Sequence, residues 1–228
     1  MIRRRSRRLL LIALFGAFVT GCFALFDLDG YGTLPAAEDA GPDALDAAAK
    51  PDAVDAAPRP RIVFVTRERW SGDLGGLDGG DARCQAVAAD AGLAGAWTAW
   101  LSDGERLDGG AGGTKVLLDG RPLRLPNGAL VAAKATDLAS RGPLAPIDVD
   151  QHGRPIEAGT GCDNGGVPVW TATLSDGGAL ENEDIDCGNW SRTFGAGVVG
   201  IVGGGDADWT VACTRPCAQA AALYCFER

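Results

Sequence analysis

The stretch DARCQAVAADAG, residues 81–92, predicts a helix with one apolar face. Asp81 is a favourable residue for capping the start of a helix, and Gly92 is typical of the position just after its end. The apolar side chains of the stretch recur at positions i, i+3, i+4 and i+7, which places them on one side of the helix. These residues are Cys84, Val87, Ala88 and Ala91.

Short apolar runs on both sides of this helix predict strands. The run RIVFVT, residues 61–66, is rich in β-branched side chains, and AWTAWL, residues 96–101, follows the helix. Between the first run and the helix, GGLDGG at residues 75–80 predicts a flexible loop. Later apolar runs cover residues 114–118, 128–133, 168–172, 198–202 and 222–226. Because glycine-rich segments separate them, we expect much of the domain to be irregular.

The N-terminus resembles the signal sequence and lipobox of bacterial lipoproteins. Five arginines lie within residues 3–8, an apolar run covers residues 9–21, and Val19-Thr20-Gly21 leads directly to Cys22. A basic start, an apolar run and small residues at the cut are the features of a secretory signal. The resemblance implies that residues 1–21 are a lipoprotein signal peptide and that Cys22 is acylated. The alternative is an uncleaved anchor, since the apolar run extends over residues 9–26 and nears the length that spans a membrane.

Residues 22–59 would then be the acylated cysteine and a disordered tether, and residues 60–228 the domain. Asp, Ala and Pro dominate residues 27–59, which have no sustained apolar face. We expect the protein in a bacterial cell envelope, lipid-anchored, at the outer membrane or cell surface. Phe23 follows the cysteine in place of the Asp that, in the resembling family, retains lipoproteins in the inner membrane.

The charge balance restricts the partners of the exported chain. Removal of residues 1–21 leaves 16 of the 21 basic residues against 30 acidic ones, a net charge of −14. Such a surface repels phosphate backbones and sulfated polysaccharides. We therefore expect no nucleic acid and no heparin-like polyanion as partner, and contact with the membrane only through the lipid.

The remaining cysteines favour disulfides over a metal site. Setting Cys22 aside leaves an even number in an exported chain, which is typical of three disulfides. They are Cys84, Cys162, Cys187, Cys213, Cys217 and Cys225. Zinc is the alternative, because Cys213 and Cys217 are spaced loosely like ligands, but no second close pair exists. His152 is the single histidine and lies in a predicted turn, Asp150–Gly153. Six cysteines allow 15 connectivities, among which their spacing does not choose.

Motifs in both halves of the domain resemble endostatin, the C-terminal domain of collagens XV and XVIII. The first half contains WSGDLGGLDGGDARCQ at residues 70–85 and AGLAGAWTAWLS at residues 91–102. The second half contains VWTAT at 169–173, CGNW at 187–190 and LYCFE at 223–227. The order holds over residues 61–228, and the pattern is closer still to bacterial lipoprotein domains of unknown function.

The resemblance implies an α+β, C-type-lectin-like fold, with a twisted antiparallel sheet, helices and long loops. It also implies that Cys84 pairs with Cys225 and that Cys187 pairs with Cys217. Cys162 and Cys213 remain as a third bond specific to this chain.

Several functional features of the resembling families have no counterpart here. The N-terminal histidines of the endostatin zinc site and its arginine cluster for heparin are missing, as are the tripeptides with which sugar-binding C-type lectins hold calcium. One acidic cluster could hold calcium in another way: Glu181, Asn182, Glu183, Asp184 and Asp186. Its spacing matches no defined calcium loop, so we favour a solvated acidic loop and expect no cofactor.

The sequence offers no recognisable catalytic constellation. Residues 195–200, GAGVVG, fit a dinucleotide-binding fingerprint, but Gly203-Gly204-Gly205 follows where that site needs a helix. Trp70 and Trp209 lie beside loops and could contact a sugar or protein, although core packing is favoured for each.

We therefore expect no enzyme, but an envelope lipoprotein that presents a non-catalytic binding or adhesion domain to a protein or neutral glycan. The alternatives are a hydrolase of envelope polymers with an unrecognised carboxylate site and a purely structural envelope component.

Overall fold

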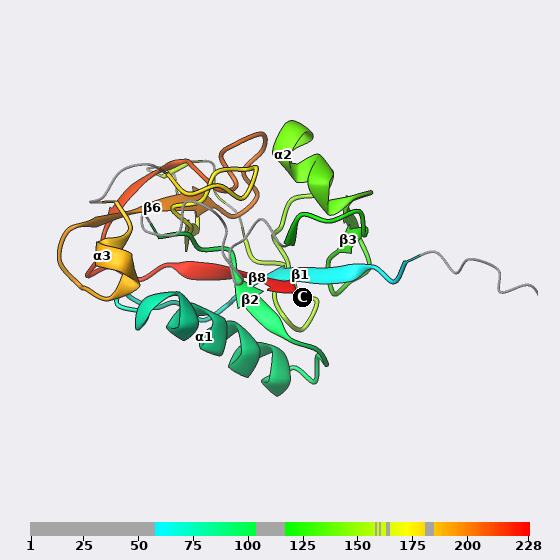
Figure 1. Cartoon of the computed structure of the whole chain (residues 1–228), viewed down its shortest axis with the longest axis horizontal. Coiled ribbons are helices and arrows are strands. Elements are labelled where there is room, and N and C mark those ends of the chain that lie inside the picture. The colour runs from blue at the N-terminus through cyan, green and yellow to red at the C-terminus, as the bar shows by residue number, and fades with distance from the viewer. Residues whose placement is uncertain (1–57, 104–116, 158, 160, 163–164, 181–184) are drawn as a thin grey trace, which may run out of the picture. The chain divides into compact units, whose positions relative to one another are not determined.

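The last strand of the chain lies at the centre of its sheet (Figure 1). The computed structural model describes residues 58–103, 117–157, 159, 161–162, 165–180 and 185–228. The strands are β1 (Arg61–Val65), β2 (Trp97–Ala99), β3 (Leu123–Arg124), β4 (Leu130–Ala132), β5 (Pro168–Trp170), β6 (Ala196–Ile201), β7 (Cys213–Pro216) and β8 (Ala222–Glu227). The helices are α1 (Gly76–Asp90), the 3-10 turn η2 (Ala135–Asp137), α2 (Leu138–Arg141) and the short turn α3 (Cys187–Trp190).

Strand β8 has three neighbours because two strands share one of its edges. The sheet runs β4-β3-β1-β8-β5-β6-β7, and β2 also pairs with β8. Along the shared edge, β5 pairs with Ala222 and Leu223 of β8, and β2 pairs with residues Cys225 to Glu227. β3 is parallel to β1 and β5 is parallel to β8, while the other pairs are antiparallel. The sequence LYCFE therefore ties both halves of the chain together.

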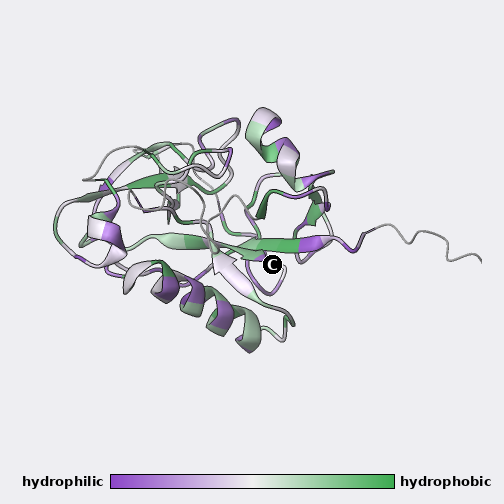
Figure 2. Ribbon diagram, in the orientation of Figure 1, coloured by the Kyte–Doolittle hydropathy of each residue, from purple (hydrophilic) through white to green (hydrophobic). Residues whose placement is uncertain are grey.

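Both faces of β8 are buried, which explains its continuous apolar sequence. Tyr224 and Phe226 belong to one core cluster, whereas Leu223 and Cys225 belong to another on the opposite face. Helix α1 covers the face of Cys225, and β3, β4 and α2 supply side chains to the other cluster. Figure 2 shows the resulting contrast between the apolar central strands and the alternating polar and apolar colours of α1.

Helix α1 begins at Gly76, so the predicted loop over residues 75–80 and the predicted start at Asp81 are wrong. Glycine is normally a poor helix former, but here the small residue is required by packing. A methyl group on Gly79 would collide with the Leu74 carbonyl, and one on Gly80 would lie 2.6 Å from Leu101 Cδ1. Close packing against Leu74 and Leu101 therefore outweighs the low helix propensity of these glycines.

The carboxylate of Asp81 does not cap the helix but joins it to β2 and to Arg228. It accepts hydrogen bonds from Thr98 Oγ1 at 2.6 Å, from the Ala99 amide at 2.8 Å and from Arg228 at 2.7 Å. The expected end of the helix is close to the observed one. Gly92, at φ 75°, follows the C-terminus, where its amide bonds to the Ala89 carbonyl.

Three disulfides bind these elements, and they have the pairing named above. Cys84 of α1 is bonded to Cys225 of β8, Cys187 of α3 to Cys217, and Cys162 to Cys213 of β7. The strands expected over residues 61–66, 96–101, 128–133, 168–172, 198–202 and 222–226 are present with shifted ends. Of the run 114–118, only residues 117 and 118 are described, and they form no strand. The domain is thus α+β, and its described residues form many strands and few helices.

Candidate functional site

Four consecutive residues of α3 have left-handed backbone conformations. The φ angles are 54° at Cys187, 62° at Gly188, 55° at Asn189 and 58° at Trp190. For a residue with a Cβ atom, this conformation costs about 1–2 kcal/mol. The surrounding structure must therefore hold the turn in place, and strained backbone of this kind is concentrated at ligand sites.

Contacts with the hydrophobic core restrain this turn. Trp190 is fully buried, donates from Nε1 to the Ser102 carbonyl at 2.8 Å and packs its ring 5.8 Å from that of Trp170. The Leu74 amide donates to the Trp190 carbonyl at 2.9 Å. The disulfide from Cys187 fixes the other end of the turn. The turn is consequently a rigid platform for the chain that follows it.

Residues 191–195 follow this turn, and all of them are exposed at the surface. Phe194 is 67% exposed, the largest exposed fraction among the large apolar side chains of the described residues. The guanidinium of Arg192 lies 5.1 Å from the centre of the Phe194 ring, a cation–π distance. It also covers Gly188, where a Cβ atom would overlap the guanidinium. The lack of a side chain at Gly188 thus gives Arg192 its place beside the ring.

A pocket of about 170 Å³ adjoins these two side chains, and we call Arg192, Phe194 and this pocket the Phe194 patch. The described residues that line the pocket are Cys187, Gly188, Arg192, Phe194, Gly195 and Ala196. The patch combines an aromatic face, a cation and exposed backbone. Aromatic and arginine side chains are the types that most often dominate binding energy at interfaces. Chemically, this arrangement can bind a partner but supplies no base or nucleophile of its own.

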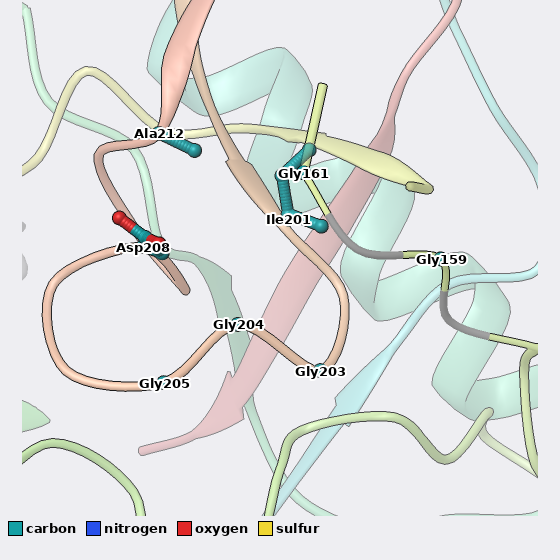
Figure 3. Close-up of a pocket in the computed structure, with 8 residues that line it drawn as sticks. All are labelled: Gly159, Gly161, Ile201, Gly203, Gly204, Gly205, Asp208 and Ala212. Atoms are coloured by element: carbon teal, nitrogen blue, oxygen red, sulfur yellow. The ribbon is translucent and has the colours of Figure 1, made fainter. Parts of the chain in front are cut away.

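A second pocket, of about 210 Å³, lies beyond the end of β6 (Figure 3). Its described lining residues are Gly159, Gly161, Ile201, Gly203, Gly204, Gly205, Asp208 and Ala212. Five of the eight are glycines, so backbone forms most of the wall. Asp208 is the single charged side chain among them, and hydroxyl or ammonium groups are the chemistry that such a wall could contact.

Trp209 packs in the core, as favoured from the sequence, so it is no longer a candidate exposed aromatic. Its side chain is 0% exposed and packs 5.1 Å from Trp100 and 5.8 Å from Tyr224, ring centre to ring centre. It belongs to the core because the chain after Ile201 folds back over β8. Trp70 is half-buried, and the Arg83 guanidinium lies 5.7 Å from its ring centre. Trp70 therefore offers only part of its ring to a ligand.

Most of the proposed calcium ligands, Glu181 to Asp184, lie outside the described residues, as does Cys22. Asp186 lies within the described residues and is 3% exposed. Its Oδ1 accepts a hydrogen bond from the Asn189 amide at 3.0 Å. This bond holds the left-handed turn, so part of the Asp186 carboxylate is already used.

Other sequence features also have plain structural roles. All but the first residue of the GAGVVG fingerprint lie in the strand β6, and this agrees with an accidental match. Residues 150–153 form the expected turn, in which the Gly153 amide donates to the Asp150 carbonyl at 2.9 Å. Among the described residues, no group of three or more His, Cys, Asp or Glu side chains could hold a metal ion.

Sequence reasoning missed Arg192 and Phe194, because a single Arg-x-Phe in a polar segment carries no periodic or motif signal. Only its place directly after CGNW could have drawn attention to it. In comparisons with known proteins, no family model and no curated protein matches the chain. None of the helices in the described residues has the length and apolarity needed to cross a membrane.

Proposed function

We propose that this protein is a lipid-anchored component of a bacterial cell envelope that presents a non-catalytic binding domain. The domain would have an endostatin-like, C-type-lectin-like fold. Two features support that assignment: the bond from the first helix to the last strand, Cys84–Cys225, and the second bond nested inside it, Cys187–Cys217. The lipobox-like sequence before Cys22 supports the anchor.

The observation that carries the binding function is the 67% exposure of Phe194, which lies shortly after a strained, core-anchored turn. An isolated exposed aromatic needs no explanation, but this one is stacked with Arg192 and follows a turn of fixed geometry in the chain. A rigid aromatic contact loses little conformational entropy on binding, which favours affinity. The Phe194 patch is therefore the proposed contact surface.

The ligand class follows from the chemistry of the patch and the charge of the chain. An aromatic face stacks on the apolar side of a sugar ring or on an apolar side chain, while the Arg192 guanidinium can bond to hydroxyl and carbonyl oxygens. The acidic chain, with a formal net charge of −9, disfavours extended polyanions. A protein surface or a neutral glycan fits both conditions.

A combined array of neutral glycans and envelope proteins, probed with the intact chain, tests this proposal. We expect saturable binding to a specific ligand that is recovered chemically unchanged. Recovery of a cleaved ligand would instead identify a hydrolase. Uniform background across the array, with the chain folded, would contradict a binding function and favour a structural role.

A further inference from the structure

A third pocket, of about 270 Å³, lies beside strands β6 and β7 and is lined by Arg215, whose guanidinium has no ion-pair partner among the described residues. The described residues that line it are Cys162, Gly166, Pro168, Val199, Ile201, Cys213, Thr214, Arg215, Pro216 and Gln219. The Cys162–Cys213 disulfide forms part of its wall. This pocket is separate from the Phe194 patch, and the inference drawn from it does not rest on the proposed function.

Arg215 is the charged side chain among these lining residues. Its Nε is buried and has no hydrogen-bond partner, and no carboxylate of the described residues forms an ion pair with it. A buried polar atom without a partner costs free energy, more so on a charged group. Arg61, by comparison, also has a buried unpaired Nε, but its other nitrogens bond to the Leu117 carbonyl and to Asp119.

The surroundings add to this cost in the ligand-free protein. Burial, followed by repulsion from the nearby positive charge of Arg69, lowers the pKa of Arg215. Among the described residues, neither Arg215 nor Arg69 forms an ion pair, although acidic residues outnumber basic ones by 30 to 21 in this chain. An anionic ligand at the terminal nitrogens of Arg215 would offset this repulsion and give the guanidinium a counter-charge.

We propose that this pocket binds a small organic carboxylate, with Arg215 as its counter-ion. The two terminal nitrogens of a guanidinium form a planar fork that matches the two oxygens of a carboxylate. Pro168, Val199 and Ile201 are buried side chains beneath a mostly polar wall, and the volume of about 270 Å³ suits a small ligand. The C-terminal carboxylate of a peptide that ends in a small residue has this chemistry.

The test uses the intact chain with N-acetyl-alanine as the carboxylate probe and N-acetyl-alaninamide as its neutral counterpart. Calorimetric titration at neutral pH should show saturable binding of the acid and none of the amide. Arg215→Gln should weaken the binding of the acid by about tenfold or more, because it removes a charged hydrogen bond. Arg215→Lys, which keeps the charge but loses the fork, should give an intermediate affinity.

Arg141→Gln is the matched control, since Arg141 is exposed at the end of α2 and does not line the pocket. It should bind the acid as the unmodified chain does. Equal binding of acid and amide, equal binding of inorganic phosphate, or full binding by Arg215→Gln would overturn the carboxylate site.

A second measurement separates loss of the site from loss of the fold. Without ligand, Arg215→Gln should have a Tm equal to or above that of the unmodified chain, because an unpaired and repelled charge has been removed. N-acetyl-alanine should raise the Tm of the unmodified chain but not that of the variant. A lowered Tm of the variant without ligand would show that Arg215 has a structural partner, and would also overturn the proposal.

Discussion

The carboxylate of Asp150 is completely buried and organises the turn that follows it. It accepts hydrogen bonds from the His152 and Arg154 amides, both at 2.9 Å, and from Arg67 Nε at 2.8 Å. Burial on its own would raise the pKa of Asp150, but these hydrogen bonds and the charge of Arg67 lower it below its ordinary value. The ionised form is therefore bound more tightly in the folded protein than in the unfolded chain.

Asp150→Asn should lower the free energy of unfolding at pH 7 by about 2 kcal/mol, because charged hydrogen bonds to three donors are weakened. A folded-state pKa below 3.8 means that the carboxylate stabilises the fold above that pH and loses this effect as the pH falls through the folded pKa. Thermal unfolding across a pH series should therefore show a difference between the two proteins at neutral pH that shrinks below about pH 4. Asp90→Asn is the control, since Asp90 is exposed on α1, and it should match the unmodified chain. A pH-independent difference would contradict this account of Asp150.

At the scale of single residues, the pairing of cysteines and the burial of tryptophans could be predicted from the sequence. Unusual backbone conformations could not. The paired cysteines and the buried tryptophans of the family-like motifs follow from composition and resemblance. Arg192 acquires its position from the open space over Gly188, and that space depends on four left-handed residues. No local pattern predicts such a turn, because only the fixed ends of the turn make it stable.

Helix α1 shows how packing at the scale of an element can reverse a propensity. Replacing a helical glycine by alanine normally stabilises a protein by up to about 1 kcal/mol. Gly79→Ala should instead lower the free energy of unfolding by about 1–3 kcal/mol, because the new methyl group would overlap the Leu74 backbone. Denaturant unfolding of the two proteins measures the difference.

The control for this substitution is Gly120→Ala, at a glycine where a Cβ atom would meet nothing within 4 Å. It should leave the free energy of unfolding nearly unchanged. A stabilised Gly79→Ala variant would show that the helix does not press against the Leu74 carbonyl. The sequence predicted the apolar face of α1 correctly but not its start, since the close contact with Leu74 is invisible to local propensity.

The three disulfides differ in exposure and should differ in their resistance to reductant. The four cysteines of Cys84–Cys225 and Cys187–Cys217 are at most 1% exposed, whereas Cys162 is exposed and Cys213 half-buried. Because thiol exchange needs access to a sulfur atom, Cys162–Cys213 should be reduced first. Alkylation and peptide mapping at increasing dithiothreitol concentrations would establish the order. Earlier loss of Cys84–Cys225 would contradict its burial between α1 and β8.

For the whole molecule, the proposed lipid anchor would determine where the domain operates. Cys22→Ser should abolish acylation and shift the protein from the detergent phase to the aqueous phase, because the acyl chains would be lost. Detergent phase partitioning with metabolic lipid labelling measures both effects. Cys162→Ser is the control, since it alters a different cysteine but leaves the lipobox-like sequence intact. Lipid labelling that persists in the Cys22→Ser protein would contradict acylation at this residue.

The binding surface itself is tested most directly by titrating an array-selected ligand against three forms of the intact chain. The unmodified chain provides the reference Kd, and Phe194→Ala should raise it by about tenfold or more, as expected for an interfacial aromatic anchor. Leu144→Ala is the matched control, because Leu144 is 64% exposed, nearly as much as Phe194, but lies outside the Phe194 patch. We predict an unchanged Kd for that variant. Equal affinity of Phe194→Ala and the unmodified chain, or a loss confined to Leu144→Ala, would contradict binding through the Phe194 patch.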